Sequence, residues 1–196
     1  MTFPPLLGDA QGRYRVHLVG NSGVGKSTVA AYLSVKLNVP HVSLDPLFWG
    51  PGWAKPTEDE FREKVDAALA QDPRGWIVDG DYGMLGSLIA DSATDVIWLD
   101  PPMMLYLPRL LWRTLLRLFG IIPTCSPGCD ETWGEVLSRK GIVWFCISNH
   151  GICKRKYAEA YRRTNLDAGG NMRRLDEWNG DLDRWKAEVE DMMRQK

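Results

Sequence analysis

The stretch Gly20-Asn21-Ser22-Gly23-Val24-Gly25-Lys26-Ser27, followed by Thr28, has the spacing G-x-x-x-x-G-K-[ST]. Residues 13–19 before it are apolar enough for a strand, and residues 26–37 have a helical pattern. Glycines let backbone N–H groups approach phosphate oxygens closely, and the start of the helix adds its positive pole. This succession of strand, loop and helix predicts a P-loop that binds a nucleoside triphosphate.

Three side chains at the end of the loop are expected to carry its chemistry. Lys26 is predicted to reach the β and γ phosphates, and the hydroxyl of Ser27 is predicted to ligate Mg²⁺. Thr28 is expected to support the loop or the α-phosphate. The predicted cofactors are therefore ATP or another nucleoside triphosphate, with Mg²⁺, and the preference between ATP and GTP stays open.

Around the loop, short apolar segments alternate with helical patterns. Strands separated by helices pair in parallel, so we expect an α/β fold with helices on both faces of a parallel sheet. Residues 57–60 (TEDE) form a capping box that begins a helix. The expected strands are residues 13–19, 41–44, 76–78, 95–99 and 171–175, and the longer helices are 26–37, 58–70, 103–119, 131–164 (with a break near 149–151) and 181–193.

The length of the chain, 196 residues, suits one domain with its own core. Residues 1–12, with prolines and glycines, are expected to form a flexible lead, and residues 13–196 a single domain. Residues 46–55 are expected to form a loop rich in aromatic side chains. We find neither an internal repeat nor a linker that would divide the chain.

Three aspartates follow predicted strands, at the ends where parallel sheets bind ligands. Asp79 is placed to hold Mg²⁺, directly or through water, and a capping role in a turn is the alternative. Asp45 is a candidate for contacting an acceptor hydroxyl, for general base, or for placing Mg²⁺, and turn formation with Pro46 is the alternative. For Asp100, a structural role and a functional role are equally open.

A stripe of arginines is the next candidate. Arg109, Arg113 and Arg117 are four residues apart and therefore lie on one side of a helix, on which no acidic residue neutralises them. Arginines that hold the transferring phosphoryl group are a known device of phosphoryl transfer. We predict phosphate contact by at least one of the three, with a solvated helix face as the alternative. Weaker candidates for phosphate contact, for most of which a solvated face is the preferred interpretation, are Arg139, Lys154, Arg155 and Lys156.

The cysteines and tryptophans are mostly expected in the core. A zinc site that includes His150 is the alternative for the cysteines, but their spacing is irregular and one lies in the apolar run IVWFCIS, so no zinc is predicted. Trp49 and Trp53 lie beside Asp45 in the sequence and are candidates for the wall of an acceptor pocket. The cysteines concerned are Cys125, Cys129, Cys146 and Cys153.

Composition narrows the class of protein. The net charge of −1 and an ordinary apolar fraction do not fit a disordered chain or a general nucleic-acid binder. The longest apolar run, residues 103–122, is interrupted by one proline and three arginines, so no membrane span is expected, and no signal peptide is apparent. We expect a cytoplasmic monomer or homodimer that has a small-molecule partner and no membrane or nucleic-acid partner.

The chain resembles, from Arg13 to about His150, the adenylate-kinase-like P-loop proteins known as DNA topology modulation proteins. The resemblance implies a five-stranded parallel sheet in the order 2-3-1-4-5 and a lid, at about residues 117–135, whose arginines close over ATP. Its most specific parts include PGC at 127–129. The matching segments, in order before the arginine helix, are GNSGVGKST (20–28), LDPLFWGPGW (44–53), WIVDGDY (76–82) and DVIWLDPP (95–102).

One departure from the wider group of nucleotide kinases is informative. Asp79-Gly80 matches the start of their D-G-F-P-R signature, but Asp81-Tyr82-Gly83 replaces F-P-R. The arginine that grips the phosphate of a nucleoside monophosphate in that group is therefore missing at this place. The resemblance consequently does not carry adenylate kinase activity with it.

Together these features predict an ATP·Mg²⁺-dependent phosphotransferase that acts on a nucleotide or another small-molecule acceptor. In this hypothesis Lys26 and the arginine stripe stabilise the charge of the moving phosphoryl group. Ser27 and Asp79 place Mg²⁺, and Asp45 positions or deprotonates the acceptor. The alternatives are a nucleotide-dependent switch or DNA-associated ATPase, and a nucleoside monophosphate kinase proper.

Overall fold

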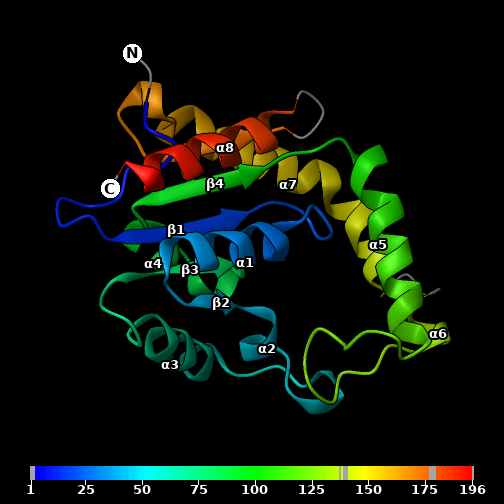
Figure 1. The fold of residues 1–196 in the computed structure, drawn as a ribbon. Helices are drawn as coiled ribbons and strands as arrows, with labels where there is room; N and C mark the ends of the chain where they lie inside the picture. The colour runs from blue at the N-terminus through cyan, green and yellow to red at the C-terminus, as the bar shows by residue number, and fades with distance from the viewer. Residues whose placement is uncertain (1–2, 137, 139–140, 177–179, 196) are drawn as a thin grey trace.

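The computed structural model describes residues 3–136, 138, 141–176 and 180–195. Its centre is a five-stranded parallel sheet in the order β2-β3-β1-β4-β5, as the resemblance implied (Figure 1). The α/β class and all five expected strands are confirmed. The strands are β1 (Tyr14–Val19), β2 (His41–Ser43), β3 (Gly75–Asp79), β4 (Asp95–Leu99) and β5 (Met172–Leu175).

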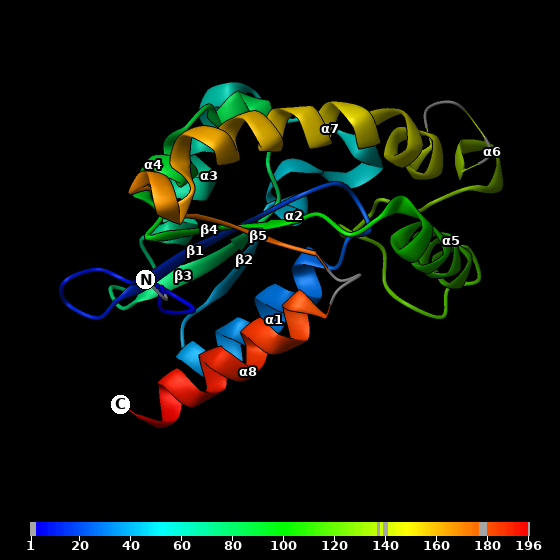
Figure 2. The same ribbon diagram turned by 90° about the horizontal axis from the view of Figure 1, so that it is seen from above.

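Helices cover both faces of this sheet. α1 (Lys26–Leu37) and α8 (Asp181–Arg194) lie on one face (Figure 2). The other face carries α3 (Glu58–Leu69), α4 (Leu88–Ser92) and α7 (Ile142–Thr164). The central strands are therefore buried on both sides, which explains why they are almost wholly apolar rather than alternating.

A further helix lies at one end of the sheet. α5 (Met103–Leu118) begins shortly after β4 and projects beyond the carboxyl ends of the strands, with the short α6 (Trp133–Val136) beside it (Figures 1 and 2). α5 packs against α7. In the part of the chain that the structure describes, no helix combines the length and the apolar character that crossing a bilayer requires.

The two cores follow the alternation of side chains along the strands. Val16 and Leu18 of β1 point to the α1 side, where they pack in one cluster with Leu33. Trp98 of β4 points to the opposite side and packs in a second cluster with Tyr157 of α7. Because successive strand residues face opposite ways, β1, β3, β4 and β5 each contribute to both cores, whereas the short β2 contributes Val42 to the second one.

Two expectations about the helices were wrong. The predicted loop at 46–55 contains α2 (Asp45–Phe48) and a 3-10 turn η1 (Pro51–Trp53), because proline suits the first turn of a helix. The predicted break at 149–151 does not occur, since α7 runs through it without interruption. One glycine in the middle of a helix costs only about 1 kcal/mol, which packing at both ends of α7 outweighs.

The expected flexible lead is held to the domain near its middle. The backbone N–H groups of Leu7 and Gly8 donate to the carboxylate of Asp95, at 2.7 and 3.1 Å. Leu6 is 1% exposed and lies in the core with Trp185 of α8, whose indole N–H donates to the carbonyl of Pro5 at 2.8 Å. A leucine pair between prolines and glycines carries no periodic signal, so only the fold reveals this contact.

The capping box gives a first test of the local structure. Thr57 Oγ1 accepts from the N–H of Glu60, and Glu60 Oε2 accepts from the N–H of Thr57, as predicted. Thr57→Ala is expected to lower the free energy of unfolding by about 1 kcal/mol, because α3 loses the cap at its first turn. Urea denaturation measures this loss, with Thr57→Ser as the control that keeps the hydroxyl. Equal stability of wild type and Thr57→Ala would contradict the prediction.

Candidate functional site

The glycine loop joins β1 to α1 and depends on glycine at both ends. Gly20 has φ of 141°, and a Cβ there would lie 2.5 Å from the carbonyl oxygen of Leu99. Gly25 has φ of 94° at the N-cap of α1. Such backbone conformations are strained for other residues, and the close approach to β4 leaves no room for a side chain. The sequence signal for the loop thus corresponds to real steric requirements.

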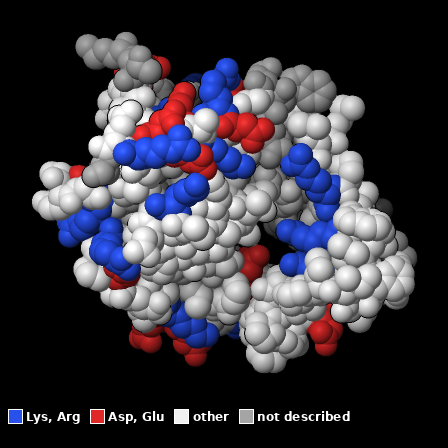
Figure 3. Space-filling model, viewed as in Figure 1, with Lys and Arg blue, Asp and Glu red and all other residues white. Residues whose placement is uncertain are grey.

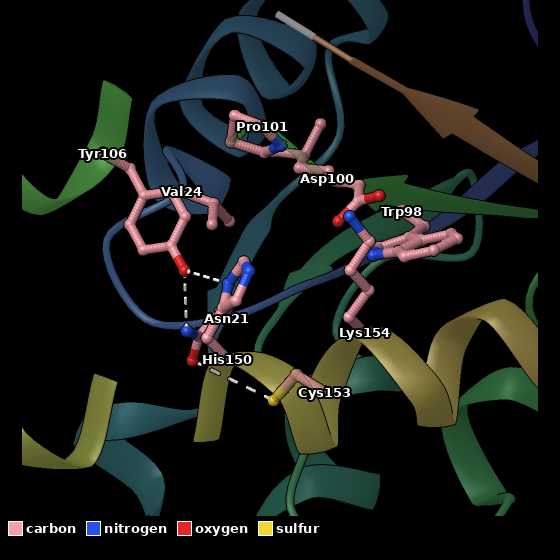
Figure 4. A pocket seen from close by; sticks show the side chains of 10 residues that line it. Asn21, Val24, Trp98, Asp100, Pro101, Tyr106, His150, Cys153 and Lys154 are labelled. Atoms are coloured by element: carbon pink, nitrogen blue, oxygen red, sulfur yellow. Dashed lines mark hydrogen bonds between the residues drawn. The ribbon is translucent and has the colours of Figure 1, made fainter. Parts of the chain in front are cut away.

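Asn21 anchors the loop to two helices. Its Nδ2 donates to the hydroxyl of Tyr106 in α5 at 3.0 Å and to the carbonyl of Cys146 in α7 at 2.8 Å. The Tyr106 hydroxyl also contacts Nδ1 of His150 at 2.7 Å, and these groups line a small pocket with Asp100 (Figure 4). The side chain of Asn21 is buried, so it anchors the loop to α5 and α7 on the side that faces the protein interior.

Lys26 lies at the first position of α1 and bends back over the loop. Its Nζ donates to the carbonyl of Gly20 at 3.0 Å and to that of Asn21 at 2.8 Å. Burial lowers the pKa of this ammonium, while the charges of Asp45 and Asp79 act in the opposite direction. Lys26 is therefore surrounded by oxygen atoms of the loop and by two carboxylates at neighbouring strand ends.

Asp79 ends β3 and is 4% exposed. Burial by itself would raise its pKa, but polar contacts from His41, Ser27 and Ser43 outweigh burial and hold the pKa below its usual value. His41 Nε2 is 3.3 Å from Asp79 Oδ1, yet within the described chain this buried oxygen lacks a well-formed hydrogen bond. An ionised carboxylate beside the Ser27 hydroxyl, with spare acceptor capacity, suits a hard cation.

Asp45 begins α2, just beyond β2, and is exposed. Its Oδ1 accepts a hydrogen bond of 2.6 Å from the hydroxyl of Tyr82, and the Tyr82 ring stacks on Phe48 at 4.2 Å between centroids. Burial, followed by the charge of Asp45, raises the pKa of Tyr82. Tyr82 therefore stays protonated, and its hydroxyl donates the hydrogen bond that orients the carboxylate of Asp45.

The segment 49–52 after α2 is bound to the loop 124–129. The N–H of Gly52 donates to the carbonyl of Gly128 at 2.8 Å, and the Ser126 hydroxyl donates to the carbonyl of Trp49 at 2.5 Å. The thiol of Cys129 donates to the carbonyl of Gly50 at 3.1 Å. Three hydrogen bonds thus join the segment 49–52, which follows Asp45 in α2, to the middle of the expected lid.

The arginine stripe turns towards this loop from α5. Arg109 is exposed, whereas Arg113 and Arg117 are half-buried or more. Burial lowers the pKa of Arg113, the charge of Arg117 lowers it further, and those of Glu131 and Asp45 raise it. Arg117 Nη1 lies 3.1 Å from Oε1 of Glu131. The stripe is therefore not a plain solvated face, because two of its members are largely shielded from solvent.

The surface of the molecule is hollowed on the side that carries α5. In the space-filling view the hollow lies between the body of the domain and α5, with basic side chains on the α5 side and an acidic group opposite them (Figure 3). Lys26, Asp45 and Asp79 follow or end neighbouring strands at one edge of the sheet, because parallel strands end together. Of the weaker candidates, Arg139 lies outside the described residues.

Sequence reasoning missed two residues that shape this site. Asp81 accepts from the hydroxyl of Tyr157 at 2.6 Å and from the ammonium of Lys156, so it ties the end of β3 to α7. Tyr82 orients Asp45, as described above. Both stand where nucleotide kinases have F-P-R, so the departure from that signature was the available signal.

The remaining candidates have mainly structural surroundings. Asp100 is 8% exposed and forms an ion pair with Arg174 of β5 at 2.6 Å. All four cysteines are free thiols. Cys146 packs against the glycine loop and Cys129 against Gly50, as given above. Trp49 and Trp53 contact each other at 5.4 Å between ring centroids, beside Phe48.

The sheet order, the glycine loop after the first strand and the helices on both faces define a P-loop kinase fold. A crystal structure of shikimate kinase from Bacteroides thetaiotaomicron is similar, with a TM-score of 0.51 and 15% identity over 92% of this chain and 98% of that one. At this identity the likeness shows the fold alone.

Among curated proteins, the uncharacterized protein YqaC of Bacillus subtilis (strain 168) is 30% identical over 102 residues, which are 52% of this chain and 57% of YqaC. The chain thus spans little more than half the length of this relative. No protein-family model matches the chain. The resemblance to DNA topology modulation proteins stays a prediction.

Proposed function

We propose that this protein transfers the γ-phosphoryl group of ATP to a hydroxyl of a small acceptor. The observation that carries the proposal is the proximity of Lys26, Asp45 and Arg113, which lie close enough for their charges to act on one another. A loop that binds phosphate, a base at the acceptor side and a cation between them are the parts that phosphoryl transfer needs.

The residues around Asp79 fit a resident Mg²⁺. Carboxylate and hydroxyl oxygens are the ligands that this cation takes, and Asp79 Oδ1 is a buried acceptor without a well-formed hydrogen bond among the described residues. Ser27 and Asp79 would hold the ion. When bound, it would neutralise charge on the β and γ phosphates.

The other residues have separate roles in the proposed reaction. The ammonium of Lys26 would exchange its bonds with the loop carbonyls for bonds with phosphate oxygens. Asp45, oriented by Tyr82, would accept the proton of the acceptor hydroxyl as the oxygen attacks phosphorus. Arg113 would lie beside the equatorial oxygens, where negative charge must be stabilised, and Arg109 and Arg117 extend the stripe.

The enclosed side of the site favours this function over a DNA-associated switch. A surface that binds duplex DNA presents basic groups to the phosphate backbone over an extended face. Here two arginines of the stripe are largely shielded from solvent, and the segment 49–52 is joined to the loop 124–129 beside Asp45. An acceptor the size of a metabolite suits this arrangement better.

The proposal is tested by measuring ADP release from ATP·Mg²⁺ in the presence of a panel of small hydroxyl compounds, which includes nucleoside monophosphates. We expect at least one compound to raise ADP release well above the rate with water alone. Turnover with a monophosphate would select a nucleoside monophosphate kinase. Release that no compound stimulates, together with DNA binding that weakens steeply with salt, would instead support the switch.

A further inference from the structure

The distal half of the arginine stripe holds buried donor atoms. The Nε atoms of Arg113 and Arg117 are both buried and have no hydrogen-bond partner among the described residues. Oε2 of Glu131 also lacks a partner in the described part of the chain, but it is an acceptor and does not itself favour an anion. Buried polar atoms are nearly always satisfied in folded proteins, so the two unpaired arginine donors mark the place of a missing acceptor.

The unpaired edges suit an oxyanion. Glu131 engages Nη1 of Arg117, which fixes the guanidinium plane and leaves the Nε edge free. This edge is one that a carboxylate or phosphate group contacts with two parallel hydrogen bonds. The Arg117 side chain is 13% exposed and that of Glu131 8%, so an anion here would be largely shielded from water and bound strongly.

The position of Arg117 separates it from the phosphoryl group. Arg113 and Arg117 are one helical turn apart, about 6 Å along α5. The charge of Arg113 acts on Lys26, while Arg117 forms an ion pair with Glu131. Cys125 of this loop is close enough to Asp45 and to Arg117 for both charges to act on its thiol. Cys125 therefore lies near both the proposed base and the distal arginine.

The geometry points to an anion subsite at Arg117, so that the acceptor is a small alcohol that also carries a carboxylate or phosphate group. Its hydroxyl would lie at Asp45 and its anionic group at the Nε edge of Arg117, with Glu131 as the positioning residue. This inference rests on the proposed function for the location of the hydroxyl, but binding of the anionic group needs no turnover.

Three probes with one carbon skeleton test the subsite: glycerate, glycerol 3-phosphate and glycerol. With the P-loop filled by a non-hydrolysable ATP analogue and Mg²⁺, alkylation of Cys125 by a neutral maleimide is followed by mass spectrometry. Cys153, on the far side of the glycine loop in α7, is the internal control. We expect one or both anions to slow alkylation of Cys125 at concentrations about 10-fold below those at which glycerol does. The two anionic arms distinguish carboxylate from phosphate.

Variants locate the effect. Arg117→Met is expected to remove the protection of Cys125. Arg117→Lys can keep the ion pair with Glu131 but is expected to weaken the protection, because lysine cannot form the bidentate hydrogen bonds of a guanidinium. Arg155→Met, on the exposed side of α7, is the matched control. Affinity for the ATP analogue, measured in each variant, shows that the fold is intact.

Equal protection by glycerol and the anions, protection that survives in Arg117→Met, or no protection by any probe would overturn the inference. Protection without ADP release from any compound of the wider panel would leave the subsite standing and refute the phosphotransferase proposal. The two failures are therefore distinguishable.

Discussion

Lys26→Ala is expected to abolish binding of ATP that calorimetry can detect and to lower turnover about 1,000-fold, the upper range for loss of one preorganised donor. The structure explains why the effect is large. Lys26 Nζ is in contact with two carbonyls of the loop, so its removal leaves both without that donor as well as taking a cation from the phosphate side. We do not expect another lysine to compensate, because in the described chain only the first residue of α1 is placed so that its side chain reaches back to the loop carbonyls.

The matched control is Lys64→Ala on the exposed side of α3. It changes the net charge by the same amount, so binding and turnover should stay at the wild-type level. Chemical denaturation of both variants separates loss of function from loss of fold. Undiminished ATP binding by Lys26→Ala would remove the basis of the whole proposal.

Asp45→Asn is expected to lower kcat by about 100- to 10,000-fold, the range for loss of a general base. ATP affinity should change little, because Asp45 is on the acceptor side of the hollow. The substitution keeps the size of the side chain and its ability to accept from Tyr82, so the geometry should survive. Asp45 is exposed, and we therefore expect stability within about 0.5 kcal/mol of wild type.

Two variants make this prediction specific. Asp66→Asn, on the exposed side of α3, is the control for the same chemical change elsewhere. Tyr82→Phe removes the donor that orients Asp45 and is expected to give a smaller loss of kcat. Steady-state kinetics with the acceptor found in the ADP-release panel provide the measurement. Wild-type kcat in Asp45→Asn would show that proton transfer does not pass through this carboxylate.

Much of the fold followed from local patterns. The five strands were predictable as short apolar segments between turn signals, α3 and α8 from their amphipathic pattern, and α1 from its place directly after the glycine loop. The glycine loop was predictable because its spacing is a steric requirement, as the carbonyl of Leu99 at 2.5 Å from a Cβ at Gly20 illustrates. The local prediction failed at α2 and at the middle of α7, where proline and glycine are compatible with a helix in this context.

The candidate site was predictable only in part. Lys26, Asp45 and Asp79 could be assigned to one edge because parallel strands end together. Tyr82 and Asp81 were noticed as a departure from a signature but had no role until their partners Asp45 and Tyr157 were placed. Glu131 gave no signal, since one acid in a loop rich in proline, glycine and cysteine has no periodicity to interpret.

By itself the sequence of residues 20–28 determined that a strand must pass into a glycine loop and a helix, because short-range sterics and backbone polarity require it. The tertiary structure alone decided what surrounds that loop. Asn21 faces α5 and α7, the segment 49–52 is joined to the loop 124–129, and Arg117 meets Glu131. These contacts depend on how packed helices bring distant residues together, and no pattern along the chain encodes that distance.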